Sequence, residues 1–368
     1  MRIKLFDYLE DLKKEKEEIY HAIDEVFNSG SLILGEKVKN FEERFSLYCG
    51  RKFGVGVGNG TDAIFLALKA INIGIGDEVI TVSNTAVPTV SAITATGAKA
   101  VFVDIEEDTY LMNVDKIENV ITSKTKCILP VHLYGQCVDM KKVNDIARKY
   151  NLYVIEDCAQ SHGAEFQGKK AGSMSHMAAF SFYPTKILGG FGDGGMIITE
   201  DKNLYEKLRR LRFYGMEHLY YSLEQGYNSR LDELHAAILL SKLKHIEEYI
   251  NKRRNLANVY YENLKDSSLI LPKEAKDRKH VYYLYVVRHP KRDLIVKKLK
   301  EKDIYVGIHY PWPIHLMEGF RHLGYGKGDL PVTEKLANEI FSLPMYPSLL
   351  PQVQERIIES IMEIIKTI

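Results

Sequence analysis

Between residues 54 and 245, short runs rich in valine and isoleucine alternate with segments of helical periodicity. This alternation constrains the fold more than any other feature, because neighbouring parallel strands need a long crossover connection, usually a helix. It predicts an α/β fold in which a mostly parallel mixed sheet is flanked by helices. The runs at 178–184 and 195–199 are expected to add strands at the margin of this sheet, where antiparallel pairing is an open alternative.

Other segments are assigned from their local pattern. Helical periodicity predicts helices at 113–121, from 231 to about 263, at 291–302 and at 352–368, while apolar runs predict strands at 280–288 and 304–311. A chain of 368 residues exceeds what one hydrophobic core usually fills. We therefore expect three parts: an arm (1–50) that packs on the small domain, a large cofactor-binding domain (51–245) and a small α/β domain (246–368).

Charge and cysteine content exclude several classes of protein. Lys and Arg total 50 against 49 Asp and Glu, a net charge of +1, which gives no support for binding to nucleic acid or to anionic membranes. The four cysteines have no metal-like spacing and are too few for a disulfide scaffold, so we expect reduced thiols and no metal. Neither a signal-peptide pattern nor a membrane span is visible, which predicts a cytoplasmic protein.

The stretch GNGTDAIF at 58–65 joins an expected strand to an expected helix. Its glycines allow the backbone to approach a ligand, and the free N–H groups of a helix N-terminus attract anions. Gly60 and Thr61 are therefore candidates for binding a phosphate. Thr61 is also consistent with a simple helix N-cap.

Asp157 ends a strand that should be buried, where an unpaired carboxylate is costly. A protonated heterocyclic nitrogen would compensate its charge, and a structural ion pair or a helix cap would do so equally well. Gln160 and His162 follow closely and are candidates for the same polar cluster.

Ser181 stands at the end of another expected strand, and Lys186 follows on a glycine-rich loop. A serine hydroxyl suits a phosphate oxygen, and a lysine in a desolvated pocket can become a nucleophilic amine that forms Schiff bases. A solvated loop lysine is the ordinary alternative. Taken together, an anion cradle, a carboxylate, a hydroxyl and a lysine match the phosphate, pyridine nitrogen and aldehyde of pyridoxal 5′-phosphate.

Eight ordered motifs carry a resemblance that spans essentially the whole chain. They are SLILGEKVKNFEERF, GVGNGTDAIFLAL, GDEVITVSNTAVPTVSAI, PVHLYGQ, VIEDCAQSHGA, SFYPTKILGGFGDGGMI, GYNSRLDELHAAIL and GIHYPWPIHL. In these motifs the chain resembles the sugar aminotransferases of the DegT/DnrJ/EryC1/StrS family, which have the type I fold of pyridoxal-phosphate enzymes. The resemblance implies an aminotransferase with pyridoxal 5′-phosphate as cofactor and its pyridoxamine form as intermediate.

The resemblance also implies roles for individual residues in the cofactor site. Lys186 would form the Schiff base, Asp157 would pair with the pyridine nitrogen, and Gln160 would contact the ring hydroxyl. The phosphate would be held by Gly60, Thr61 and Ser181, and by Asn228 of a second subunit, which implies a homodimer with shared sites. Ala86 stands where many members carry an aromatic ring that stacks on the cofactor, so that stacking should be weaker here.

The motif GIHYPWPIHL is similar to that of family members that aminate carbon 3 of a nucleotide-linked keto sugar. The expected sugar contacts are Tyr183, Tyr221, Arg230, His309, Tyr310 and His315. The resemblance implies L-glutamate as amino donor and a dTDP-linked 3-keto-6-deoxyhexose as acceptor. A UDP-linked 3-keto sugar, a 4-keto sugar, and a non-catalytic regulator that binds the cofactor or a sugar nucleotide remain alternatives.

Overall fold

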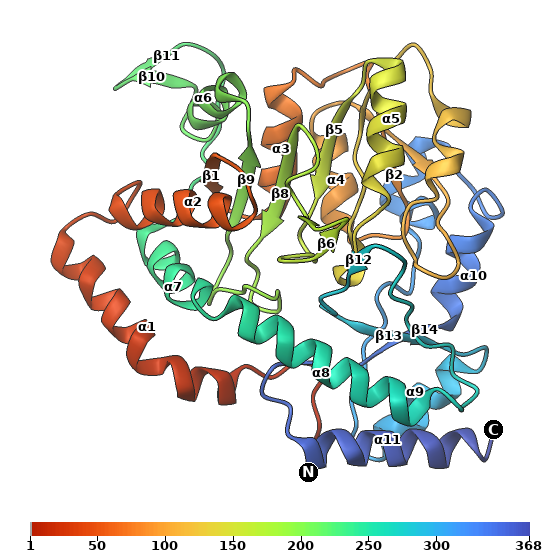
Figure 1. The fold of residues 1–368 in the computed structure, drawn as a ribbon. Coiled ribbons are helices and arrows are strands. Elements are labelled where there is room, and N and C mark those ends of the chain that lie inside the picture. Colours follow the sequence, from red (N-terminus) through yellow and green to blue (C-terminus); the bar gives the residue numbers. More distant parts are fainter. Residues whose placement is uncertain (1) are drawn as a thin grey trace.

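The computed structural model describes residues 2–368 and is built around a seven-stranded sheet of order β1-β9-β8-β5-β4-β2-β3 (Figure 1). The strands from β3 to β8 are parallel, whereas β9 pairs antiparallel with both β8 and β1. The strands are β1 (Phe53–Val57), β2 (Glu78–Val82), β3 (Lys99–Val103), β4 (Thr125–Ile128), β5 (Tyr153–Asp157), β8 (Met177–Ser181) and β9 (Gly195–Thr199). The predicted mostly parallel α/β sheet is confirmed, and its antiparallel margin is formed by β9 and β1.

Helices cover this sheet and extend to the second half of the chain (Figure 1). The helices are α1 (Leu9–Ser29), α2 (Glu36–Tyr48), α3 (Gly60–Ala70), α4 (Val87–Ala95), α5 (Met140–Tyr150), α6 (Lys202–Leu211), α7 (Glu233–Leu243), α8 (Ile246–Leu264), α9 (Arg292–Glu301), α10 (Pro331–Glu339) and α11 (Pro351–Ile365). Within the described residues, none of these helices is both long enough and apolar enough to cross a membrane.

The central strands read as continuous Val/Ile runs because both of their faces are covered. In β2 and β5 every residue after the first is buried. Such burial from both sides is typical of parallel sheets packed between two layers of helices. A polar side chain at the carboxyl end of one of these strands therefore lies at the edge of the core, as Asp157 does.

Three expected elements differ in the structure. Residues 113–121 form two short 3₁₀ turns, η1 (Val114–Lys116) and η2 (Glu118–Val120), because so short a segment gains little from helix propagation. The helix expected from 231 to about 263 is two helices, α7 and α8, which meet at His245. The strand expected at 304–311 is limited to single bridges, and the prolines at 311 and 313 have no N–H with which to extend them.

Two separate groups of buried apolar side chains lie on either side of α8. The larger packs between the main sheet and its helices, and the smaller lies between α8, α9, α11 and the two-stranded sheet of β13 (Tyr285–Arg288) and β14 (Ile340–Leu343). The N-terminal segment contacts both groups: α1 and α2 pack against α7, while Ile3 pairs with Ile304. The residue boundaries of the three expected parts stay predictions.

Candidate active site

The candidate residues come from the carboxyl ends of neighbouring strands and the N-terminus of one helix. Asp157 ends β5, Ser181 ends β8, and Gly60 begins α3. Lys186 follows β8 on the loop to β9. Ligands of open α/β sheets bind outside these strand ends, so the topology brings the candidates to the edge where a site is expected.

Gly60 and Ser181 touch so closely that no side chain fits at position 60. A Cβ atom there would lie 2.6 Å from the Ser181 Cβ. The N-cap of α3 is Asn59, whose side chain accepts a hydrogen bond from the Asp62 N–H at 2.9 Å, so Thr61 is not the cap. Within residues 2–368 the Thr61 hydroxyl has no hydrogen-bond partner. The helix N-terminus and two hydroxyls thus form a cradle that suits a phosphate.

Asp157 is buried, at 4% exposure, and forms no ion pair within the described chain. Its Oδ2 accepts a hydrogen bond from the Thr89 hydroxyl at 2.8 Å, and its Oδ1 accepts one from the Ala159 N–H at 3.1 Å. Burial raises the pKa of Asp157, and these hydrogen bonds and the charge of Lys186 oppose that rise. The ion-pair alternative is therefore excluded, and the carboxylate suits a cationic N–H group.

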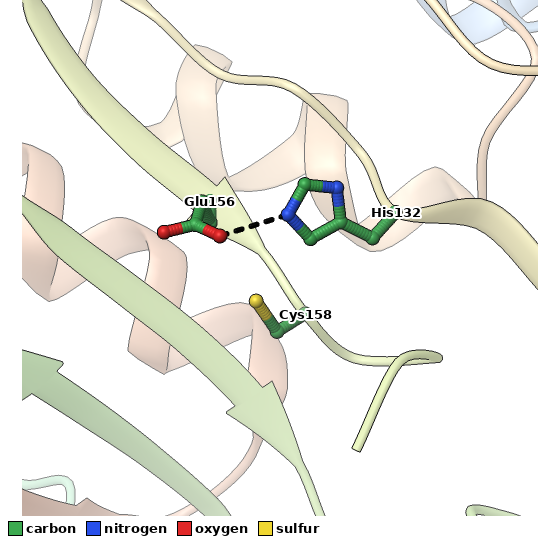
Figure 2. Close-up of side chains that lie close together, drawn as sticks. All are labelled: His132, Glu156 and Cys158. Atoms are coloured by element: carbon green, nitrogen blue, oxygen red, sulfur yellow. Dashed lines mark hydrogen bonds and ion pairs between the residues drawn. The ribbon is translucent and has the colours of Figure 1, made fainter. Parts of the chain in front are cut away.

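Directly beside Asp157 lies a fully buried group of three side chains, His132, Glu156 and Cys158 (Figure 2). The His132 Nε2 and the Glu156 Oε2 are 2.9 Å apart, and Glu156 also accepts hydrogen bonds from Gly172, Met174 and Ser175.

These three side chains are close enough to hold a metal ion. However, the His132 Nδ1 accepts a hydrogen bond from the Val138 N–H at 3.1 Å, and burial raises the pKa of the Cys158 thiol well above its ordinary value. Burial alone would raise the pKa of Glu156, but its hydrogen bonds lower it overall. The donor atoms are therefore used within the protein, and the group anchors the end of β5.

Lys186 is half-buried, and within residues 2–368 its ammonium forms no hydrogen bond or ion pair. Nζ lies 4.8 Å from the centroid of the Tyr283 ring. The charge of Lys186 opposes the rise in the pKa of Asp157 and adds to the lowering of the pKa of His162 and of His309. Lys186 thus lies over the Tyr283 ring on the loop that follows β8, and its role as the Schiff-base lysine stays a prediction.

Gln160 links the strand end to the loop that carries the GIHYPWPIHL motif. Its Oε1 accepts a hydrogen bond from the Tyr134 N–H at 2.9 Å, and its Nε2 donates to the Tyr310 hydroxyl at 3.0 Å. The Tyr134 hydroxyl donates to the His309 carbonyl. The two tyrosines and Gln160 thus hold this loop against the main sheet.

The two histidines of the loop have different surroundings. The His309 Nδ1 is 2.9 Å from the Ser342 hydroxyl, and burial, aided by the Lys186 charge, lowers the pKa of His309 to about 4. His315 is buried, with Nδ1 2.7 Å from the Ser83 hydroxyl and Nε2 3.2 Å from Glu334. Both ring nitrogens of His315 are thus used within the protein, whereas among the described residues only Nδ1 of the His309 ring has a hydrogen-bond partner.

His162 belongs to the aromatic core and not to the polar cluster. Its ring is fully buried among Phe45, Phe180 and Phe182, with centroids 6.1, 5.3 and 5.8 Å away. Burial, with a contribution from Lys186, lowers the pKa of His162 to about 3. His162 is therefore a neutral core residue.

The remaining candidates lie farther out. Ala86 is the N-cap of α4, half-buried and near Thr89. Asn228, Tyr221 and Tyr183 are exposed, and the Arg230 guanidinium lies 5.2 Å from the Phe213 ring centroid. Tyr221 belongs to the hairpin of β10 (Met216–His218) and β11 (Tyr221–Ser222), which projects from the body beside α6 (Figure 1).

Three functional residues were not predicted from the sequence: Thr89, Tyr134 and Tyr283. Thr89 bonds Asp157, Tyr134 bonds Gln160, and Tyr283 lies under Lys186. Thr89 follows a strand end, as Thr61 does, and was detectable on that ground. The tyrosines lie in ordinary apolar runs, and no local pattern marks them.

The residues fit pyridoxal 5′-phosphate on three observations. Position 60 has no room for a side chain beside Ser181, the Asp157 carboxylate lacks a cation, and the Lys186 amine lacks a partner within the described chain. These features suit a phosphate, a pyridine nitrogen and an aldehyde, respectively.

Comparisons with known proteins identify the family of the chain. Residues 13–362 match the model of the DegT/DnrJ/EryC1/StrS aminotransferase family. The chain is 51% identical, over 99% of each chain, to a dTDP-3-amino-3,4,6-trideoxy-alpha-D-glucose transaminase of Micromonospora megalomicea subsp. nigra. It is 44% identical, over 99% of this chain and 98% of the other, to a pleiotropic regulatory protein of Geobacillus stearothermophilus. Its fold matches that of S. venezuelae DesV in complex with a ketimine intermediate, with a TM-score of 0.97, 39% identity and 98% coverage of each chain.

Proposed function

The chain belongs to the DegT/DnrJ/EryC1/StrS aminotransferase family, and from this premise we propose that it transfers an amino group from L-glutamate to the 3-keto carbon of a dTDP-linked 6-deoxyhexose. It is a pyridoxal-phosphate-dependent sugar aminotransferase. The product would be a dTDP-3-amino-3,6-dideoxyhexose. The observation that carries the proposal is the unpaired Lys186 amine beside Asp157 and the Gly60–Ser181 cradle.

Each residue of the proposed cofactor site would hold a different part of the cofactor. The N–H groups at the start of α3 and the hydroxyls of Thr61 and Ser181 would hold the phosphate. Asp157 would hold the pyridine nitrogen in its protonated form, because a buried carboxylate gains most from a cationic partner. When bound there, pyridoxal phosphate supplies an aldehyde that takes up amines and a ring that accepts electrons.

Lys186 supplies the base. When not bonded to the cofactor, its Nζ would move one proton between the amine-bearing carbon of the substrate and the aldehyde carbon of the cofactor, so that its own protonation is unchanged over a half-reaction. Glutamate leaves as 2-oxoglutarate in the first half-reaction, and the sugar receives the amine in the second. His309 is uncharged near neutral pH, since its pKa is lowered to about 4, and it would donate or accept a hydrogen bond at the sugar.

The acceptor is inferred from the relatives and the GIHYPWPIHL loop. The Micromonospora relative is a dTDP-3-amino-sugar transaminase and matches the chain over its whole length. Tyr183, Tyr221, Arg230, His309 and Tyr310 are the proposed sugar-nucleotide contacts. We propose that His315, which is bonded on both sides, acts by fixing the loop.

We also propose that the enzyme is a homodimer with shared sites. The hairpin and the segment that leads to Asn228 are exposed, and Leu219, Tyr220 and Tyr221 present apolar area to solvent at 74%, 87% and 60% exposure. A second copy would cover this area and receive Asn228 at its phosphate. Location in the cytoplasm remains a prediction.

The first test is the visible absorption spectrum of the cofactor-loaded protein before and after L-glutamate is added without sugar. Loss of the band of the lysine-bound cofactor, together with release of 2-oxoglutarate, is expected. A band that glutamate leaves unchanged would exclude glutamate as donor, and the absence of any such band would overturn the role of Lys186.

The acceptor is tested by offering dTDP- and UDP-linked 3-keto and 4-keto sugars to the glutamate-treated enzyme. We expect the dTDP-linked 3-keto sugar to restore the band fastest. A second candidate is a regulator, which the name of the Geobacillus relative favours. Binding of a sugar nucleotide without amination of any acceptor would support the regulator.

A further inference from the structure

We propose that the ring of Tyr283 binds and positions the Lys186 ammonium whenever the lysine is not bonded to the cofactor. We call this ring the platform of Lys186. The inference rests on the proposed function and extends it to a residue outside the cofactor cradle. Nζ lies 4.8 Å from the Tyr283 ring centroid, a distance at which the negative face of an aromatic ring attracts a cation. Among the described residues Nζ forms no hydrogen bond or ion pair, and the Tyr283 ring face is the contact that the structure gives for the ammonium.

The Tyr283 ring is tied to the same loop as the lysine. Its hydroxyl and the Thr185 hydroxyl are 3.0 Å apart, and Thr185 directly precedes Lys186. The side chain is only 9% exposed. A change in the position of the loop would therefore move the ring and the lysine together.

The backbone of Tyr283 is also held from two sides. Gly135 packs against it with φ +105, and a Cβ atom on that glycine would lie 2.9 Å from the Tyr283 nitrogen. On the other side Arg253 donates to the carbonyls of Tyr283 and Met345, at 3.1 Å each. Burial lowers the pKa of Arg253 to about 10, and the guanidinium remains charged at neutral pH. Burying a cation costs free energy, and the hydrogen bonds that Arg253 donates to these carbonyls hold the backbone that carries the Tyr283 ring.

The ring explains how a half-buried lysine can alternate between two states. As a neutral amine, Nζ uses its lone pair to bind a proton; as an ammonium, it rests on the ring until it returns that proton. An aromatic face favours the charged form without a carboxylate that would compete for the proton permanently. Tyr283 is thus a positioning residue for the proton-transferring group.

Several other ionisable groups face Lys186 and must be held constant in any test. They are Asp157, His162 and His309 on the sheet side, and Asp11, Glu15, Lys242, Tyr249 and Arg253 around the small cavity behind the loop.

The test measures the reaction of Lys186 with cyanate in the full-length protein freed of cofactor, by mass spectrometry, as a function of pH. Isocyanic acid, the reactive form of cyanate, modifies only the uncharged amine. When each rate is divided by the isocyanic acid concentration at that pH, the midpoint pH reports the protonation of Lys186 and the plateau reports its accessibility. In Tyr283→Leu we expect the midpoint to fall, which makes modification below the midpoint about 3- to 10-fold faster. Tyr283→Phe keeps the ring and should keep the midpoint of the wild type.

Tyr283→Met is the replacement if the leucine variant does not fold, because it also removes the ring at similar volume. A midpoint that is the same in wild type, Phe and Leu (or Met) variants would overturn the proposal, even if the plateau rate changed. The readout needs no sugar. The test can therefore overturn the proposal for Tyr283 without affecting the proposed amination, and the proposed amination can be overturned without affecting the proposal for Tyr283.

Discussion

The edge of the main sheet and the β10–β11 hairpin differ in how far a single chain completes them. At the sheet edge, Asp157, Gln160 and Ser181 are bonded or packed within the chain, and Gly60 has no space to spare. At the hairpin, Leu219 and Tyr220 are almost fully exposed. A single chain thus completes the packing at the sheet edge, which would hold the cofactor ring. The hairpin region, which is expected to reach the phosphate of a second subunit, is still exposed.

The largest expected effect is at the sheet edge, with Lys186→Ala. Loss of the nucleophile and base should lower turnover by at least about 10⁴-fold, because the alanine side chain can neither form the Schiff base nor move the proton. Folding and dimer formation should persist, since Lys186 has no ion pair within residues 2–368. Initial rates with glutamate and the keto sugar, together with sedimentation velocity, measure both outcomes.

The matched control is Lys327→Ala, at an exposed lysine. Turnover close to that of the wild type in Lys186→Ala would refute the assigned role.

Gly60→Ala should have the second largest effect. The new Cβ would lie 2.6 Å from the Ser181 Cβ, and the resulting overpacking should weaken cofactor affinity by about 10-fold or more. Absorbance titration of cofactor-free protein measures the affinity. Gly319→Ala is the control, because a Cβ there meets nothing within 4 Å.

A second change tests whether crowding is the cause. Adding Ser181→Gly to Gly60→Ala removes the clashing Cβ and should recover the thermal stability lost by the single variant, although the phosphate loses a hydroxyl. If Gly60→Ala binds the cofactor normally, the two residues do not form a tight cradle.

At the hairpin, Leu219→Ser combined with Tyr220→Ser should weaken dimer formation about 10-fold or more, since large exposed side chains often carry interface energy. Sedimentation velocity over a range of protein concentration reports the dissociation constant. Ile75→Ser, at a 93% exposed position away from the hairpin, is the control. An unchanged dimer would assign the hairpin another role.

The last effect is on stability and not on activity, and it concerns the core behind the site. Because folding lowers the pKa of His162 from 6.5 to about 3, the unfolded chain binds a proton that the folded chain does not, and stability is lost as pH falls through this range. Between pH 7 and 4.5 the wild type should lose about 3 kcal/mol more than His162→Phe. Urea unfolding at both pH values measures this difference, and equal losses would contradict it.

The sequence predicted the sheet, and it predicted which polar residues lie at the edge of that sheet, because both depend on local patterns. Val/Ile runs mark strands that are covered on both faces, and polar residues at their ends mark the site, as Asp157 and Ser181 illustrate. What it missed depends on contacts between distant segments. Neither the platform at Tyr283 nor the division of the long helix at His245 has a local sign.

The same difference applies to the substrate side. The pattern of the GIHYPWPIHL loop does not distinguish His309, whose ring is bonded at one nitrogen to Ser342, from His315, which is bonded to Ser83 and Glu334. Only the fold separates them.

The contact between Gly60 and Ser181 also has a consequence for how the chain folds during synthesis. These two residues are far apart in sequence. Strand β1, which directly precedes Gly60, pairs with β9 and can do so only after β9 has been synthesised. Contacts of such long range form late. A nascent chain that has not yet emerged beyond residue 199 therefore has no complete phosphate cradle. The cofactor can stabilise the protein only after β9 has paired with β1.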